Sequence, residues 1–67
     1  MVKVIDNNKV YTYNGGVCLF AQFCASIELG VFNYTLEKST KVSDKKRVYE
    51  LINLHTLENE IVTIEII

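Results

Sequence analysis

Alternating apolar and polar residues predict two short strands at the start of the chain. Residues 2–5 and 10–13 are rich in β-branched and aromatic side chains, which favour strands. The four residues between them are Asp, Asn, Asn and Lys, and Asp and Asn tolerate the positive φ angles of tight turns. These two segments are therefore expected to form a β-hairpin, which ends at the following Asn-Gly-Gly.

The spacing of the apolar residues then changes from the two-residue period of a strand to the period of a helix. Val17, Phe20, Cys24 and Ile27 recur at helical spacing, with polar residues between them. Gly30 stands where a glycine commonly ends a helix in the left-handed conformation. The pattern predicts one amphipathic helix over residues 17–29, although the first four of these residues could also extend as a strand.

Alternation returns after the glycine. Phe32, Tyr34 and Leu36 fall on one face of a half-buried strand, with polar residues on the other face. The next ten residues, 38–47, are polar and mostly basic. They are interpreted as a loop with its turn at residues 43–44.

Residues 48–56 fit either a strand or a helix. A strand places Val48, Ile52 and Leu54 on one face but leaves a glutamate among them. A helix would instead cluster Val48, Leu51, Ile52 and His55, with Ser43 as its N-terminal cap. The strand is preferred, because a turn at 57–60 would then join it to a strongly alternating last strand.

These elements predict a single α+β domain over residues 1–67. The expected architecture is an antiparallel sheet of about five strands with one helix packed on one face, in the order ββαβββ. A helix at 44–58 would change the order to ββαβαβ. The apolar run at 61–64 would promote aggregation at a sheet edge, so it must be paired inside the sheet or covered by a second copy. A homodimer through an edge strand is therefore a hypothesis.

The composition of the chain indicates the class of protein to expect and its cellular compartment. The chain has 67 residues, of which 49% are hydrophobic and 22% charged, as in a globular domain. No run approaches the roughly 18 apolar residues of a membrane span. A charged residue interrupts the apolar start of the chain, so no signal peptide is expected. The sequence predicts a cytoplasmic protein without membrane association, in the host cytoplasm if the protein is viral.

The candidate chemistry is sparse. Cys18, Cys24 and His55 are too few for a structural zinc site, which takes about four ligands. The two cysteines fall on the apolar side of the predicted helix, where a thiol stays protonated and inert. We therefore expect two buried thiols, no catalytic residues, no metal site, no cofactor and no enzymatic activity.

Charge is distributed unevenly. The segment 38–47 holds five of the seven basic residues and one acid, a net charge of +4, and the rest of the chain carries −5, which together give −1. The loop can simply be solvated, contact phosphates, or dock on an acidic protein surface. Its basic residues are Lys38, Lys41, Lys45, Lys46 and Arg47.

The leading functional hypothesis is a small protein-binding module that acts by steric binding to a larger partner. The Lys-, Asn- and Ile-rich composition suits an AT-rich genome, which points to a phage or mobile-element inhibitor of a host protein. The expected contacts are the basic loop and the exposed tyrosines Tyr11, Tyr13 and Tyr49, because Tyr and Arg supply much of the energy of interfaces. The alternative is a small nucleic-acid-binding regulatory protein that uses the basic loop.

Overall fold

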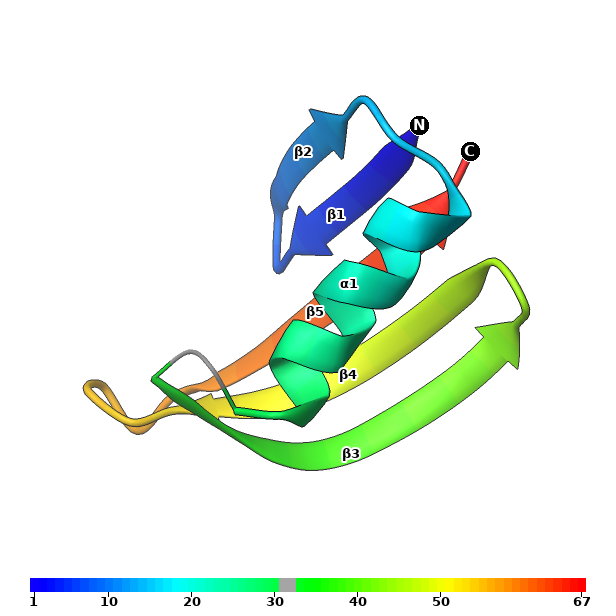
Figure 1. Ribbon diagram of the computed structural model, residues 1–67. Helices are drawn as coiled ribbons and strands as arrows, with labels where there is room; N and C mark the ends of the chain where they lie inside the picture. The colour runs from blue at the N-terminus through cyan, green and yellow to red at the C-terminus, as the bar shows by residue number, and fades with distance from the viewer. Residues whose placement is uncertain (31–32) are drawn as a thin grey trace.

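A computed structural model describes residues 1–30 and 33–67 of the chain. It shows five antiparallel strands in one sheet and a single helix that crosses one face of the sheet (Figure 1). The predicted α+β fold and its ββαβββ order are confirmed. The elements are β1 (Val2–Asp6), β2 (Lys9–Tyr13), α1 (Val17–Glu28), β3 (Tyr34–Ser43), β4 (Lys46–Asn53) and β5 (Asn59–Ile66).

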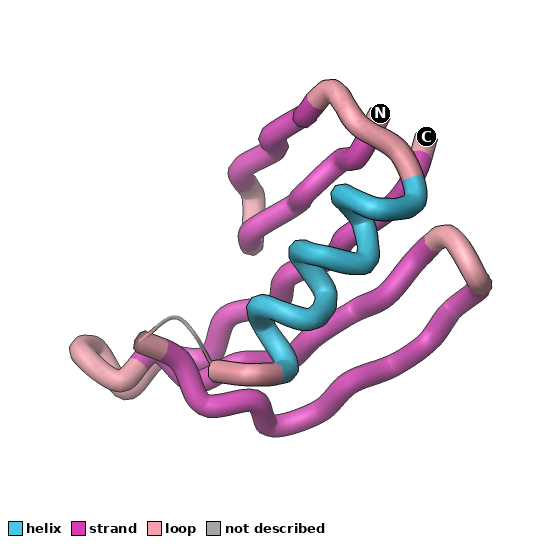
Figure 2. Tube along the Cα trace, in the orientation of Figure 1, coloured by secondary structure: helices cyan, strands magenta, loops and turns pink. Residues whose placement is uncertain are grey.

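The last strand lies in the middle of the sheet. The strand order is β2-β1-β5-β4-β3, so β5 pairs with β1 on one side and β4 on the other. The two chain ends consequently lie side by side (Figure 2), and the Ile67 amide donates a 2.9 Å hydrogen bond to the Met1 carbonyl. Because the apolar C-terminal run is paired on both sides, it gives no reason for a dimer. The edges of the sheet are β2 and β3, and pairing of copies through either one stays a prediction.

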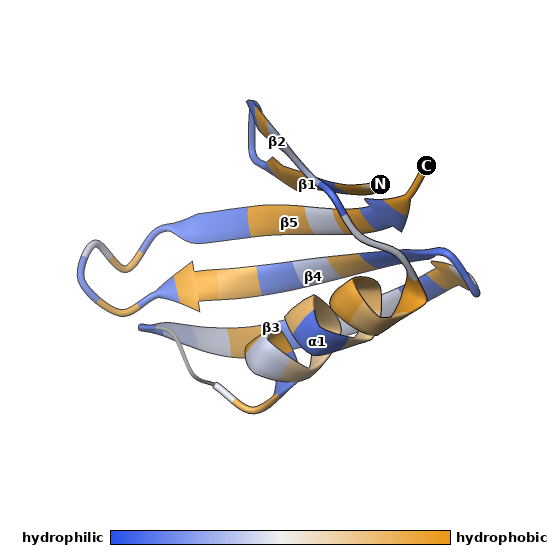
Figure 3. Ribbon diagram, turned by 45° about the horizontal axis from the view of Figure 1, so that its top comes forward, coloured by the Kyte–Doolittle hydropathy of each residue, from blue (hydrophilic) through white to orange (hydrophobic). Residues whose placement is uncertain are grey.

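The core lies between α1 and the central strands. Successive side chains of a strand point to opposite faces, so one side of β4 and of β5 faces the helix, and apolar positions occur along both strands (Figure 3). Each fully buried large apolar side chain contributes about 1.5–3 kcal/mol to stability. The buried residues are Val2, Phe20, Cys24, Tyr49, Leu51, Val62 and Ile64.

The predicted helix over residues 17–29 is confirmed, since α1 covers Val17–Glu28, but the burial of its first residues differs from the prediction. Gly30 follows α1 with a φ of +70°, the left-handed conformation that glycine adopts without strain. Cys24 is buried, as expected, but Cys18 and Val17 are exposed. The expectation of two buried thiols is thus wrong for Cys18, because Cys18 is two residues before the buried Phe20 and therefore lies on the opposite side of the helix.

The prediction of a basic loop at residues 38–47 is wrong. Residues 38–47 belong mostly to β3 and β4, which are joined by a two-residue turn at Asp44 and Lys45. Most of β3 is exposed, since it is an edge strand, and it therefore lacks the apolar alternation that marks a buried strand. In the first part of β3, Tyr34 and Leu36 pack against the core as predicted, whereas Phe32 lies outside the described residues.

The choice of a strand for residues 48–56 is confirmed over β4, but its faces are the reverse of the prediction. Tyr49 and Leu51 face the helix and are buried, whereas Val48 and Ile52 share the opposite face with Glu50. Burial of the Glu50 carboxylate against the helix would cost free energy, so the face that carries it lies away from the helix. Leu54 follows β4 in the connecting loop and is exposed.

Candidate functional site

A groove with a volume of about 300 Å³ lies between α1 and the β1–β2 hairpin. Its floor is formed by the sheet, from Val4 of β1 and the β5 residues Val62 and Ile64. Phe23 and Ile27 of the helix form one wall. The groove is predominantly apolar, which is typical of binding sites for small molecules and side chains.

The second wall consists of two tyrosines from the edge strand β2. Tyr11 and Tyr13 lie opposite Val4 and Val2 in the β1–β2 register, so they share the helix side of the sheet. The ring of Tyr13 contacts that of Phe23 at a centroid distance of 5.1 Å, which connects the hairpin to the helix. Because β2 has a neighbour on one side only, Tyr11 and Tyr13 stay 44% and 41% exposed. The prediction that these two tyrosines are exposed is confirmed.

Two carboxylates and a tyrosine also line the groove. Asp6 lies opposite Val62 in the β1–β5 register, and Glu60 is two residues before Val62 on the same face. Such diagonal neighbours are within reach of each other's side chains. Tyr34 at the start of β3 lines the groove beside them. We call Asp6, Glu60 and Tyr34 the acidic end of the groove.

Electrostatics at the acidic end favour protonated groups. The pKa of Asp6 is raised, first by partial burial and then by the negative charge of Glu60, and the nearby Lys9 only partly offsets this. Burial, followed by the charges of Glu60 and Asp6, also raises the pKa of Tyr34. Asn53 donates a 3.3 Å hydrogen bond from its Nδ2 to Oε1 of Glu60. This bond holds the Glu60 carboxylate in place but supplies no positive charge.

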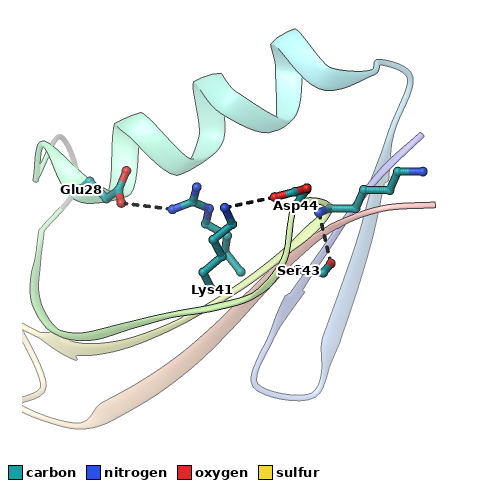
Figure 4. A network of polar contacts seen from close by, with 6 residues as sticks. Glu28, Lys41, Ser43 and Asp44 are labelled. Atoms are coloured by element: carbon teal, nitrogen blue, oxygen red, sulfur yellow. Dashed lines mark hydrogen bonds and ion pairs between the residues drawn. The ribbon is translucent and has the colours of Figure 1, made fainter.

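The basic residues predicted to contact a partner do not form one patch. Lys41 and Arg47 lie opposite each other on the helix side of the β3–β4 hairpin. Lys41 Nζ is 3.0 Å from Oδ1 of Asp44, and an Arg47 nitrogen is 3.9 Å from Oε1 of Glu28 (Figure 4). Both cations therefore have an acidic neighbour.

The other lysines of the segment point elsewhere. Lys38 lies opposite Glu50 and Lys46 lies opposite Glu65, on the face of the sheet away from the helix. Lys45 is in the turn. The structure thus divides the basic segment between two faces and a turn, and places an acid near or opposite four of its five cations.

Tyr49 is not the exposed contact residue that was predicted. Its side chain is fully buried against α1, and among the described residues its hydroxyl has no hydrogen-bond partner. Burial is the main cause that raises the pKa of this hydroxyl, followed by the adjacent Cys24 thiol, which is only a weak hydrogen-bonding group and does not reach hydrogen-bond geometry, and then by the charge of Glu28. Tyr49 is a core residue and is removed from the candidate contact surface.

Other kinds of site find no support in the described parts of the chain. Across residues 1–30 and 33–67, no three His, Cys, Asp or Glu side chains gather closely enough to hold a metal ion. Within the same ranges, no helix is long and apolar enough to cross a membrane.

The acidic end was missed by sequence reasoning. The sequence places Asp6 in the predicted hairpin turn and Glu60 in the predicted turn at 57–60, and no local pattern connects them. They meet because β1 pairs with β5, a contact between opposite ends of the sequence. The only local signal was that Asp6 continues the alternation of Val2 and Val4.

Comparison of the chain with protein-family models, curated protein sequences and solved structures gave no match. The geometry of the groove is therefore the main indication of function.

Proposed function

We propose that this domain is a small protein-binding module that holds a segment of a larger partner in the groove between α1 and the β1–β2 hairpin. The observation that carries the proposal is the groove itself, with about 300 Å³ of space between apolar walls and two half-exposed tyrosines. Small-molecule sites span about 300–1,000 Å³, so this groove suits one or two side chains. A short partner segment is therefore a better match than a folded element.

The composition of the groove suits a protein partner. Tyr11 and Tyr13 offer large, rigid contact areas with little loss of side-chain entropy, which is why tyrosine is frequent at interfaces. Tyr13 is also braced by Phe23, so its ring is partly positioned before binding. In this proposal the domain acts by steric occupation of its partner, as a phage or mobile-element inhibitor of a host protein would.

Binding of nucleic acid by the basic segment has weaker support. Non-specific phosphate binding needs several cations on one surface. Lys41 and Arg47 are instead paired with acids, and Lys38 and Lys46 lie on the other face of the sheet. The groove is thus the stronger candidate for a contact surface.

The proposal is tested by selecting binders from a displayed random-peptide library and measuring their affinity for two matched variants. Tyr11→Ala removes a groove wall, whereas Thr12→Ala changes the neighbouring residue on the opposite face of β2. We expect the selected peptides to bind Tyr11→Ala about tenfold or more weakly and Thr12→Ala unchanged, as at an interface anchor. Circular dichroism confirms that both variants stay folded. Peptides that bind both variants equally well, or a library that yields no binders, would refute the proposal.

A further inference from the structure

No ion pair between described residues neutralises the acidic end of the groove. The nearby Lys9, which lines an adjacent cavity with Asp6 and Glu60, only partly offsets the rise in the pKa of Asp6. Among the described residues the ion pairs are Lys41–Asp44 and Arg47–Glu28, and neither involves Asp6 or Glu60. Lys9 lies opposite Asp6 in the β1–β2 register, yet it forms no ion pair with that carboxylate. Two acids of like charge therefore share one end of a mainly apolar groove.

This arrangement is unfavourable for the isolated protein. Partial burial and the charge of Glu60 both favour the neutral form of Asp6. Carboxylates that are placed together at a cost to stability are found more often at functional sites than elsewhere. A positive group bound between Asp6 and Glu60 would remove the repulsion between them.

The walls indicate which positive group fits. A guanidinium group is planar, less strongly hydrated than an ammonium group, and stacks on aromatic rings. It also donates hydrogen bonds in a fixed fork that two carboxylates can accept. The aromatic rings of Tyr11 and Tyr34 line the same groove as the two carboxylates, and Ile27 and Val62 offer apolar surface for an alkyl stem.

We propose that the acidic end of this groove binds an arginine side chain of the partner segment. The guanidinium lies between the carboxylates of Asp6 and Glu60, and the methylene groups of the arginine cover Val62 and Ile27. This inference rests on the proposed protein-binding function, and it gives the chemical class of the residue that the groove recognises.

The test uses four synthetic peptide libraries that differ only in their central residue, which is arginine, lysine, citrulline or norleucine. Citrulline keeps the shape of arginine and removes its charge. We expect the arginine library to bind the wild-type protein about tenfold or more tightly than the citrulline library, with the lysine library between them.

Matched variants locate the effect. Glu60→Gln and Asp6→Asn should each abolish most of the preference for arginine over citrulline. Glu50→Gln removes a glutamate from the opposite face of the sheet and should leave that preference unchanged. Because the readout is a ratio between two libraries on one variant, a general loss of stability does not imitate the result.

Three outcomes separate failure of this inference from failure of the proposed function. Peptides that depend on Tyr11 but bind equally well with arginine and citrulline would overturn the inference and leave the protein-binding function standing. An arginine preference that persists in Glu60→Gln and Asp6→Asn, or that is lost in Glu50→Gln, would place the cation elsewhere and also overturn the inference. Failure of every library to show dependence on Tyr11 would refute the proposed function itself.

Discussion

The substitution Tyr49→Phe removes one oxygen atom from the centre of the core and leaves the aromatic ring in place. Tyr49 is fully buried, and among the described residues nothing accepts or donates a hydrogen bond to its hydroxyl. In water that hydroxyl forms hydrogen bonds, which are lost when the chain folds. The wild-type protein therefore bears a desolvation cost that the phenylalanine variant avoids.

The size of the effect follows from the cost of an unsatisfied buried group. Leaving a buried donor or acceptor without a partner costs about 1–3 kcal/mol, whereas an ordinary buried hydrogen bond contributes about 0.5–1.5 kcal/mol. We therefore expect Tyr49→Phe to raise the free energy of unfolding by about 1 kcal/mol or more. For a domain of this size, 1 kcal/mol corresponds to an increase in Tm of about 4–8 °C.

The assay is urea unfolding at pH 7, followed by circular dichroism, with Tyr11→Phe as the control. Tyr11 is 44% exposed, so loss of its hydroxyl should change the unfolding free energy by less than about 0.5 kcal/mol. An alkaline series adds an independent check. Folding raises the pKa of Tyr49 above its ordinary value of 10.0, so the folded state favours the protonated hydroxyl. Below pH 10 the hydroxyl is protonated in both states and does not affect the pH dependence of stability; as the pH rises further the free energy of unfolding should fall, and Tyr49→Phe should reduce this fall.

A decrease in stability of about 1 kcal/mol or more in Tyr49→Phe would refute the reasoning, since it is the result expected when a hydroxyl has a hydrogen-bond partner. The neighbouring Cys24 is the residue to examine in that case. A double-mutant cycle with Cys24→Ala would measure whether the thiol and the hydroxyl interact.

Three further substitutions test other parts of the structure by thermal or urea unfolding. Asp6→Asn should stabilise the protein by about 0.2–1 kcal/mol at pH 7. Because the pKa of Asp6 is raised in the folded state, this gain should disappear below pH 3.8, where the carboxyl is protonated in both the folded and the unfolded state. A gain at pH 3 equal to that at pH 7 would contradict the raised pKa of Asp6. Cys24→Ser should lower the unfolding free energy by about 1–3 kcal/mol, because it buries a hydroxyl in the core. Cys18→Ser changes an exposed residue and should be neutral. Equal effects of the two substitutions would show that α1 is oriented differently. Leu57→Asn should stabilise the loop before β5 by up to about 1 kcal/mol, since Leu57 has a φ of 61° that asparagine tolerates better; a loss of stability would show that this conformation carries no strain.

Local sequence patterns were sufficient to predict the elements whose two faces differ in polarity. Alternation marked β5 because Val62 and Ile64 face the core while Thr63 and Glu65 face away. It failed for β4, where Val48, Tyr49, Leu51 and Ile52 place apolar side chains on both faces. In such a strand, only the packing of the helix decides which face becomes buried.

The remaining errors have a different physical origin. The basic segment was interpreted as a loop because an exposed edge strand needs no apolar face, so its composition resembles that of a loop. The acidic end was not predictable from local sequence, because Asp6 and Glu60 approach each other only through the pairing of β1 with β5. Prediction of such a site requires the strand order, which depends on contacts between distant parts of the chain.

The central place of β5 has a consequence for how the protein is made. Of the five strands, β5 leaves the ribosome last, yet β1 and β4 have no direct pairing with each other. Until β5 arrives, the nascent chain can form only two separate hairpins, each with an unpaired strand edge exposed to other chains. The contacts that join the hairpins are long-range and close slowly. Completion of the sheet is therefore a late event, and the interval between synthesis of β4 and insertion of β5 is when the protein is most exposed to aggregation and proteolysis.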